Sequence, residues 1–162
     1  MEEHLKQVYP KIANFCAYQE RTHEEVRQRL AKFFVLPDDA EILITRLIED
    51  KYLNEHRYAQ TYVGGKFRIK KWGKNRILYE LKRKNLSEYS IRSAMKEIKE
   101  ADYKQTLQKL AQKKLEILLN NGESISPILK KKLAAYLIQK GYEPELVWEM
   151  VEEVLKNKNS NI

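Results

Sequence analysis

The chain has 162 residues and a formal charge of +8, with 31 Lys and Arg against 23 Asp and Glu. This length suits one compact domain or a short array, and 43% hydrophobic residues can form a core, which excludes a disordered chain. Five Gly and four Pro are too few for the many turns of a β-sandwich or barrel. The composition therefore predicts an all-α fold.

Hydrophobic residues recur at helical spacing through the first third of the chain. A first helix is expected over about residues 10–19, with Cys16 on its apolar face. Thr22 followed by Glu25 has the spacing of a capping box and predicts the start of a second helix. After a break at Pro37, a third helix is expected to end near residue 51. The second helix has Val26, Leu30 and Phe33 at helical intervals, and the third carries Ile42, Leu43, Leu47 and Ile48.

The same order of helices and breaks recurs twice. A long helix over about residues 55–70 is followed by a turn at Trp72 and Gly73, a second helix, a break at Asn85 and a third helix capped by Ser87. A further copy begins near residue 102 and has a break near residue 122. The aligned core positions are Val26, Ile77 and Leu133, and then Leu30, Leu81 and Leu137.

This pattern predicts a tandem array of three three-helix units, at residues 1–53, 54–100 and 101–162. In such arrays each unit contacts mainly its neighbours, so we expect an elongated or curved monomer. A recognition helix of the helix-turn-helix kind needs a basic or neutral face, but the third helices of the first and third units are acidic. Sequence-specific DNA reading is therefore disfavoured.

Positive charge is concentrated in one segment, residues 66–84. Nine basic residues and only Glu80 lie there, which gives this segment a charge of +8, whereas residues 1–65 sum to −2 and residues 85–162 to +2. Such a strip favours an anionic partner, because an ordinary solvated face mixes in more acids. The candidate binding residues are Lys66, Arg68, Lys70, Lys71, Trp72, Lys74, Arg76, Lys82, Arg83 and Lys84.

Aromatic residues lie within or beside this strip. Phe67 and Tyr79 are expected in the core, whereas Trp72 is left open between a core residue and a stacking platform for a nucleic acid. Gly64 and Gly65 each cost about 1 kcal/mol in a helix interior. They indicate either a kink or close helix crossing, or a flexible point beside the strip.

The sequence offers no catalytic constellation, and we expect no enzyme, no cofactor and no metal site. The three His residues are separated and have acidic neighbours, which predicts surface positions. A single Cys excludes an internal disulfide and, with no apolar run near the roughly 20 residues of a membrane span, favours a soluble cytoplasmic protein.

Three motifs, in order, resemble those of the RecX family, regulators of the bacterial recombinase RecA. Residues 52–59, YLNEHRYA, resemble that family's Gly-Tyr-Leu-Asp-Asp-x-Arg-Phe-Ala junction, without its leading Gly, which is Lys51 here, and with Asn54 in place of its first Asp. Residues 70–81 are similar to the signature of its second unit, and residues 132–142 to the helix and cap of its third. Lys71 and Lys74 replace the usual Gly and Pro. The matching positions in residues 70–81 are Gly73, Arg76, Ile77, Glu80 and Leu81.

The resemblance implies a non-enzymatic, three-unit helical protein that lies in the groove of the RecA–DNA filament. Such a protein restrains the recombinase, ATPase and coprotease activities of RecA, and so acts in homologous recombination, DNA repair and the SOS response. The residues alone also leave open a protein that binds single- or double-stranded DNA non-specifically, with no recombinase partner.

Overall fold

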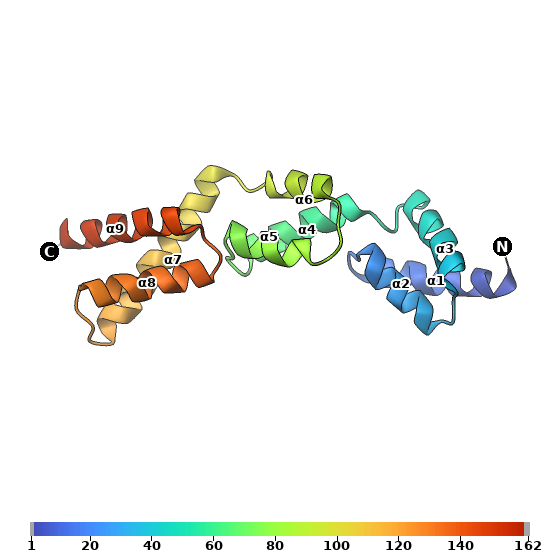
Figure 1. Ribbon diagram of the computed structural model, residues 1–162, viewed down its shortest axis with the longest axis horizontal. Coiled ribbons are helices and arrows are strands. Elements are labelled where there is room, and N and C mark those ends of the chain that lie inside the picture. The colour runs from blue at the N-terminus through green and yellow to red at the C-terminus, as the bar shows by residue number, and fades with distance from the viewer. Residues whose placement is uncertain (1, 161–162) are drawn as a thin grey trace. The chain divides into compact units, whose positions relative to one another are not determined.

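The computed structural model describes residues 2–160, and all regular structure in that range is α-helical (Figure 1). This confirms the all-α prediction. None of the described helices is long and apolar enough to cross a membrane. The helices, in chain order, are α1 (Glu3–Tyr18), α2 (His23–Lys32), α3 (Pro37–Glu49), α4 (Glu55–Arg68), α5 (Lys74–Lys82), α6 (Glu88–Met95), α7 (Glu100–Asn120), α8 (Pro127–Gln139) and α9 (Pro144–Ser160).

By their internal packing, the described residues form two compact units. The first compact unit contains the chain up to Tyr62 together with Leu81–Ala94, and the second contains Val63–Glu80 together with the chain from Met95 onward. Helix α4 begins in the first unit and ends in the second. The division at residues 1–53, 54–100 and 101–162 stays a prediction.

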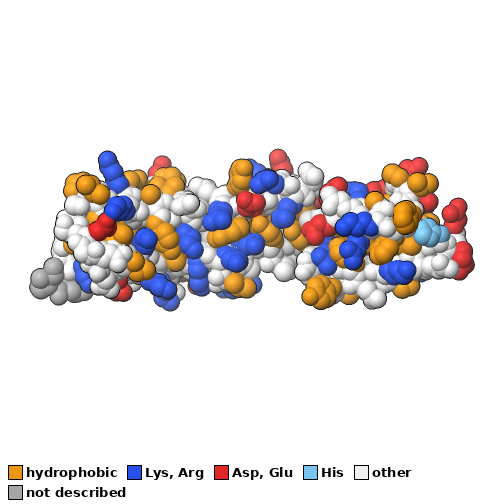
Figure 2. All heavy atoms as spheres, turned by 90° about the horizontal axis from the view of Figure 1, so that it is seen from below, with side chains coloured by type: hydrophobic (Ala, Val, Ile, Leu, Met, Phe, Trp, Pro, Cys, Tyr) orange, Lys and Arg blue, Asp and Glu red, His pale blue; other side chains and the backbone are white. Residues whose placement is uncertain are grey.

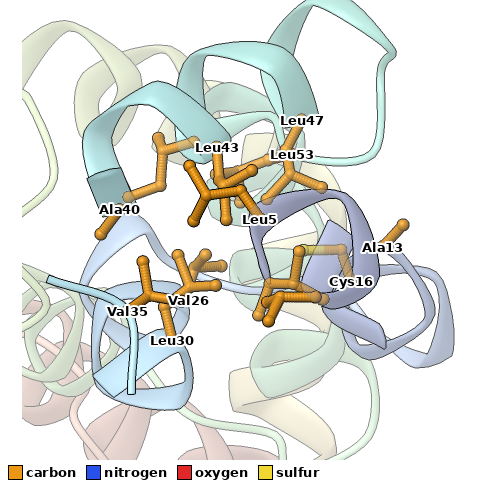
Figure 3. Close-up of a cluster of buried hydrophobic side chains, with 13 residues drawn as sticks. Leu5, Ala13, Cys16, Val26, Leu30, Val35, Ala40, Leu43, Leu47 and Leu53 are labelled. Carbon is orange, nitrogen blue, oxygen red and sulfur yellow. The ribbon is translucent and has the colours of Figure 1, made fainter. Parts of the chain in front are cut away.

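In the first compact unit, α1, α2 and α3 pack around one hydrophobic core (Figure 3). Burying each Leu, Ile or Val side chain contributes about 1.5–3 kcal/mol, which is the main driving force for this packing. Helix α2 starts with the predicted capping box. The Thr22 hydroxyl accepts from the Glu25 backbone N–H at 3.0 Å, and the Glu25 carboxylate accepts from the Thr22 N–H at 3.3 Å.

Helix α1 begins seven residues earlier than the sequence predicted, at Glu3 instead of about residue 10, so Pro10 lies inside it. Proline lacks an N–H and costs about 3 kcal/mol in a helix interior. Leu5 and Val8, each 3% exposed, lie in the added segment and pack into the core. Their burial offsets the cost of the proline.

Two of the four hydrophobic residues that the sequence analysis named in α3 lie outside its buried face. Ile42 and Ile48 are 54% and 45% exposed. The buried stripe of this helix is Ala40, Leu43, Ile44 and Leu47, at the spacing i, i+3, i+4 and i+7. Positions 42 and 48 fall outside that stripe.

Several helices end with a residue in the left-handed conformation, where φ is positive. At the end of α2, Phe34 has φ 61°, and its N–H donates to the Ala31 carbonyl while the Val35 N–H donates to the Leu30 carbonyl. This pair of bonds is a Schellman motif, which satisfies the last carbonyls of the helix. The equivalent positions in the repeat are Asn85, with φ 57°, and Gly141, with φ 108°. The sequence repeat is therefore also a repeat of backbone conformation.

Candidate partner-binding surface

The turn between α4 and α5, which lies within the predicted strip, is fixed to the end of α8 in the second compact unit. The Gly73 N–H donates to the Lys140 carbonyl and the Asn75 N–H donates to the Gly141 carbonyl, each at 2.9 Å. A Cβ atom on Gly73 would lie 2.3 Å from the carbonyl carbon of Gly141. Two turns therefore cross backbone to backbone, and a side chain on Gly73 would prevent that approach.

Two buried tyrosines form hydrogen bonds to the backbone of this turn. The Tyr103 hydroxyl accepts from the Lys74 N–H at 2.9 Å and donates to the Glu143 carboxylate. The Tyr142 hydroxyl donates to the Lys71 carbonyl at 2.9 Å, and the centroids of the two tyrosine rings are 5.1 Å apart. Burial, with the hydrogen bond to Glu143, raises the pKa of Tyr103, and burial raises the pKa of Tyr142. Both hydroxyls therefore stay protonated and keep donating at neutral pH.

Trp72 is half-buried and its ring is in contact with two cations. The Lys66 Nζ lies 4.8 Å from the ring centroid, and the Arg76 Cζ lies 4.1 Å from it. Cation–π contacts of this kind contribute about 0.5–1 kcal/mol at exposed sites. The ring restrains both long side chains at the surface, so less rotamer freedom remains to be lost when they meet an anion.

The two aromatic residues expected in the core behave differently. Phe67 is 8% exposed and packs 5.9 Å from the Tyr103 ring, which confirms that prediction. Tyr79 is 62% exposed, so its prediction as a core residue was wrong. Helix α5 turns Ile77 and Leu81 inward, and Tyr79, two residues from each, lies on the opposite face.

The other basic residues of the strip differ in what they contact. Lys74 forms a 2.9 Å ion pair with Glu100 and lies 4.6 Å from the centroid of the Tyr103 ring, so it supports the turn. The Lys71 ammonium donates to the Arg68 carbonyl at 2.7 Å, at the end of α4. Lys70 is exposed.

The last three basic residues of the strip, Lys82, Arg83 and Lys84, belong to the first compact unit. Lys84 places its Nζ 5.3 Å from the Tyr62 ring centroid. Residues 66–76 belong to the second unit. A single band through all ten predicted residues stays a prediction.

The structure adds a second cation–aromatic cluster that the sequence did not predict. Tyr136 on α8 has the Lys114 Nζ at 4.9 Å and the Lys140 Nζ at 5.9 Å from its ring centroid. Lys140 is also the residue whose carbonyl holds Gly73, so this cluster adjoins the turn that carries Trp72. No sequence signal marked it, because Lys114 lies on another helix and is distant in the chain. Figure 2 shows Lys and Arg side chains interleaved with hydrophobic ones on the face that it presents.

The residues with potential reaction chemistry lie in ordinary structural environments. Burial raises the pKa of the Cys16 thiol to about 11, so this side chain is a protonated core residue at neutral pH. His4 bonds to the Phe33 carbonyl at 3.0 Å, and His56, predicted at the surface, is half-buried and stacks on Tyr89. Between residues 2 and 160, no three His, Cys, Asp or Glu side chains gather in a way that could hold a metal ion.

Comparison with known proteins identifies the family. Residues 54–95 match the model of the RecX second three-helix domain, and residues 101–151 match that of the RecX third three-helix domain, together more than half of the chain. The chain belongs to the RecX family. These matches, with the helices described above, confirm the predicted three-helix repeats.

Similar RecX proteins come from several bacteria. The chain is 33% identical over 138 residues to the regulatory protein RecX of Clostridium perfringens strain 13, covering 85% of this chain and 64% of that protein. It is 27% identical over 160 residues to that of Bacillus cytotoxicus, covering 98% of this chain and 58% of that protein. A crystal structure of RecX from Lactobacillus salivarius, 20% identical, superposes with a TM-score of 0.83 over 95% of this chain and 98% of that one. The chain thus spans 58% and 64% of the length of these two curated relatives.

Two departures from the RecX sequence pattern now have a structural consequence. Lys51 and Lys71 occupy positions where glycine is usual, and both have positive φ, 67° and 61°. Each non-glycine residue in this conformation costs about 1–2 kcal/mol. The turn geometry is therefore retained without glycine, at some loss of stability.

The two neighbouring glycines of α4 differ in what an added Cβ atom would meet. A Cβ on Gly64 would lie 2.6 Å from the Arg68 guanidinium, so this glycine makes room for a flexible side chain. A Cβ on Gly65 would meet nothing within 4 Å. Because the Arg68 guanidinium can move aside, close packing does not require glycine at either position.

Proposed function

We propose that this chain is a non-catalytic regulator that binds the RecA–DNA filament and restrains its recombinase, ATPase and coprotease activities. Membership of the RecX family carries the proposal, because the matched relatives are named regulatory protein RecX. The cation–aromatic surface around Trp72 supports it, since that surface suits the anionic groups of a nucleoprotein filament.

We assign different tasks to the residues of the strip. Lys66, Arg68, Lys70 and Arg76 meet carboxylates or phosphates of the filament, with Trp72 restraining two of them. Lys82, Arg83 and Lys84, which belong to the first compact unit, meet anionic groups of the filament on their own. Lys71 and Lys74 mainly hold the turn, because their side chains already bond to the Arg68 carbonyl and the Glu100 carboxylate.

Charge reversal at two outward residues tests this assignment. The double variant Lys70→Glu/Arg76→Glu should lose at least about tenfold in inhibition of RecA strand exchange, because it places two carboxylates opposite the anionic groups of the filament and like charges repel. A matched control, Lys113→Glu/Lys131→Glu, makes the same change in charge at exposed residues of α7 and α8. Both variants should keep wild-type helicity by circular dichroism.

The assignment is contradicted if Lys70→Glu/Arg76→Glu inhibits strand exchange as strongly as the control variant does.

The second candidate function is non-specific binding of nucleic acid without a recombinase. Trp72 favours it, since an aromatic ring among cations is a feature of single-strand binding sites. That function predicts naked-DNA binding as tight as filament binding. If about six cations met phosphates directly, the log–log salt slope would be about −4 to −5.

A further inference from the structure

Phe34 combines two properties that the fold does not require. It has φ 61°, a conformation that glycine and asparagine accept and that a bulky residue rarely adopts. The other two units have Asn85 and Gly141 at the same register position, so the helix end forms without an aromatic residue there. The Phe34 side chain is also 88% exposed, so it contributes little to the core.

The loop that carries Phe34 is rigidly held. The Phe34 N–H donates to the Ala31 carbonyl at 3.0 Å and the Val35 N–H donates to the Leu30 carbonyl at 3.1 Å, while the Val35 side chain is buried at 6% exposure. Leu36, one residue further, is 69% exposed. The loop therefore projects two large apolar side chains from fixed backbone, and strain at such a position indicates a function.

Charged residues contact the neighbouring Phe33 or follow the loop directly in the chain. The Lys11 Nζ and the Arg29 Cζ each lie 5.8 Å from the centroid of the Phe33 ring, which precedes Phe34 in the chain. Asp38 and Asp39 occupy the first turn of α3, directly after Leu36 and Pro37. Exposed apolar side chains with charged residues of both signs nearby in the chain have the composition of a protein–protein interface.

We propose that Phe34 and Leu36, the Phe34 knob, insert into an apolar pocket on the protein subunits of the filament. The inference rests on the proposed function and adds to it a contact made by the first compact unit. Two observations favour protein over nucleic acid as the occupant. The knob consists of two exposed apolar side chains, which offer phosphate no hydrogen-bond donor, and Asp38 and Asp39, which follow it directly in the chain, repel phosphate.

The variant Phe34→Asn separates a binding role from a structural one. Asparagine accepts positive φ, so the variant should melt at or above the wild-type temperature, whereas its affinity for RecA filaments preformed on single-stranded DNA should fall about 30-fold, as for an interface hot spot. Phe34→Leu keeps an apolar knob and should lose less than about fivefold. Tyr18→Asn, at another exposed aromatic residue of the same unit, 83% exposed, is the matched control and should bind as the wild type does.

Filament affinity is measured by co-sedimentation, with naked single-stranded DNA in parallel. If Phe34→Asn binds the filament as tightly as the wild-type chain does, the inference is wrong, but the proposed function is unaffected. An equal loss of affinity for naked DNA also overturns it, by assigning the knob to nucleic acid. Absence of filament binding by the wild type refutes the proposed function, and the inference falls with it. Loss of filament binding alone, in a variant at least as stable as the wild type, supports the knob as a docking residue.

Discussion

Replacement of Gly73 by alanine tests whether close backbone contact with the end of α8 holds the turn between α4 and α5 in place. The new Cβ would lie 2.3 Å from the Gly141 carbonyl carbon and the Tyr142 nitrogen, which are backbone atoms that cannot rotate away. Moving the turn apart by about 1 Å breaks or stretches two backbone hydrogen bonds, at about 0.5–1.5 kcal/mol each, and overpacking adds about 1–3 kcal/mol. We expect Gly73→Ala to destabilise the chain by about 2–5 kcal/mol and to lower Tm by at least about 5 °C.

Gly65→Ala is the matched control, because it is the same substitution nearby in the same unit. Nothing lies within 4 Å of the added Cβ, so alanine should stabilise α4 by about 1 kcal/mol. Thermal and urea unfolding, followed by circular dichroism at the helical band, measure both variants. A change in Tm of about 2 °C corresponds to about 1 kcal/mol or less in a chain of this size. If Gly73→Ala melts within about 2 °C of the wild type, the close crossing does not support the turn.

Two further outcomes follow from the buried groups. Tyr103→Phe should destabilise the chain by about 1–3 kcal/mol in urea unfolding, because the Lys74 N–H and the Glu143 carboxylate both lose a partner; an unchanged midpoint would contradict this. The raised pKa of Cys16, about 11, favours the protonated thiol in the folded state, so stability is retained below pH 9 and decreases as the pH rises toward 11. Cys16→Ala should make that alkaline decrease less steep, and an identical decrease would refute the reasoning.

Local signals in the sequence predicted the elements well where one short-range interaction decides the structure. Thr22 and Glu25 are three residues apart and form the capping box that their spacing indicates. The apolar repeat placed Val26, Ile77 and Leu133 in the core, and all three are fully buried. The capping partners are neighbours along the chain, and the period of the apolar pattern shows which face of each helix is buried.

Where tertiary contacts decide, the sequence was less informative. Helix α1 includes Pro10 because Leu5 and Val8 are buried by other helices, which no local rule gives. Tyr79 was expected inside because aromatic residues are usually buried, but the stripe of α5 is set by Ile77 and Leu81. Propensity is a weak guide when packing selects the face.

The candidate site was partly accessible from the sequence. The excess of charge at residues 66–84 is visible in composition, whereas the tasks of its members depend on contacts with distant segments. Lys74 pairs with Glu100, and Lys140 and Tyr136 add a second cluster beside the turn. Composition therefore indicated the region, and only the fold separates turn-supporting residues from outward ones.

Co-sedimentation of the wild-type chain with preformed RecA filaments, against naked DNA at matched salt, tests the proposed function most directly. Contacts with the protein subunits, in addition to those with phosphate, predict that the chain pellets with filaments at salt concentrations where binding to naked DNA is lost. Equal binding to both at every salt concentration would contradict filament recognition.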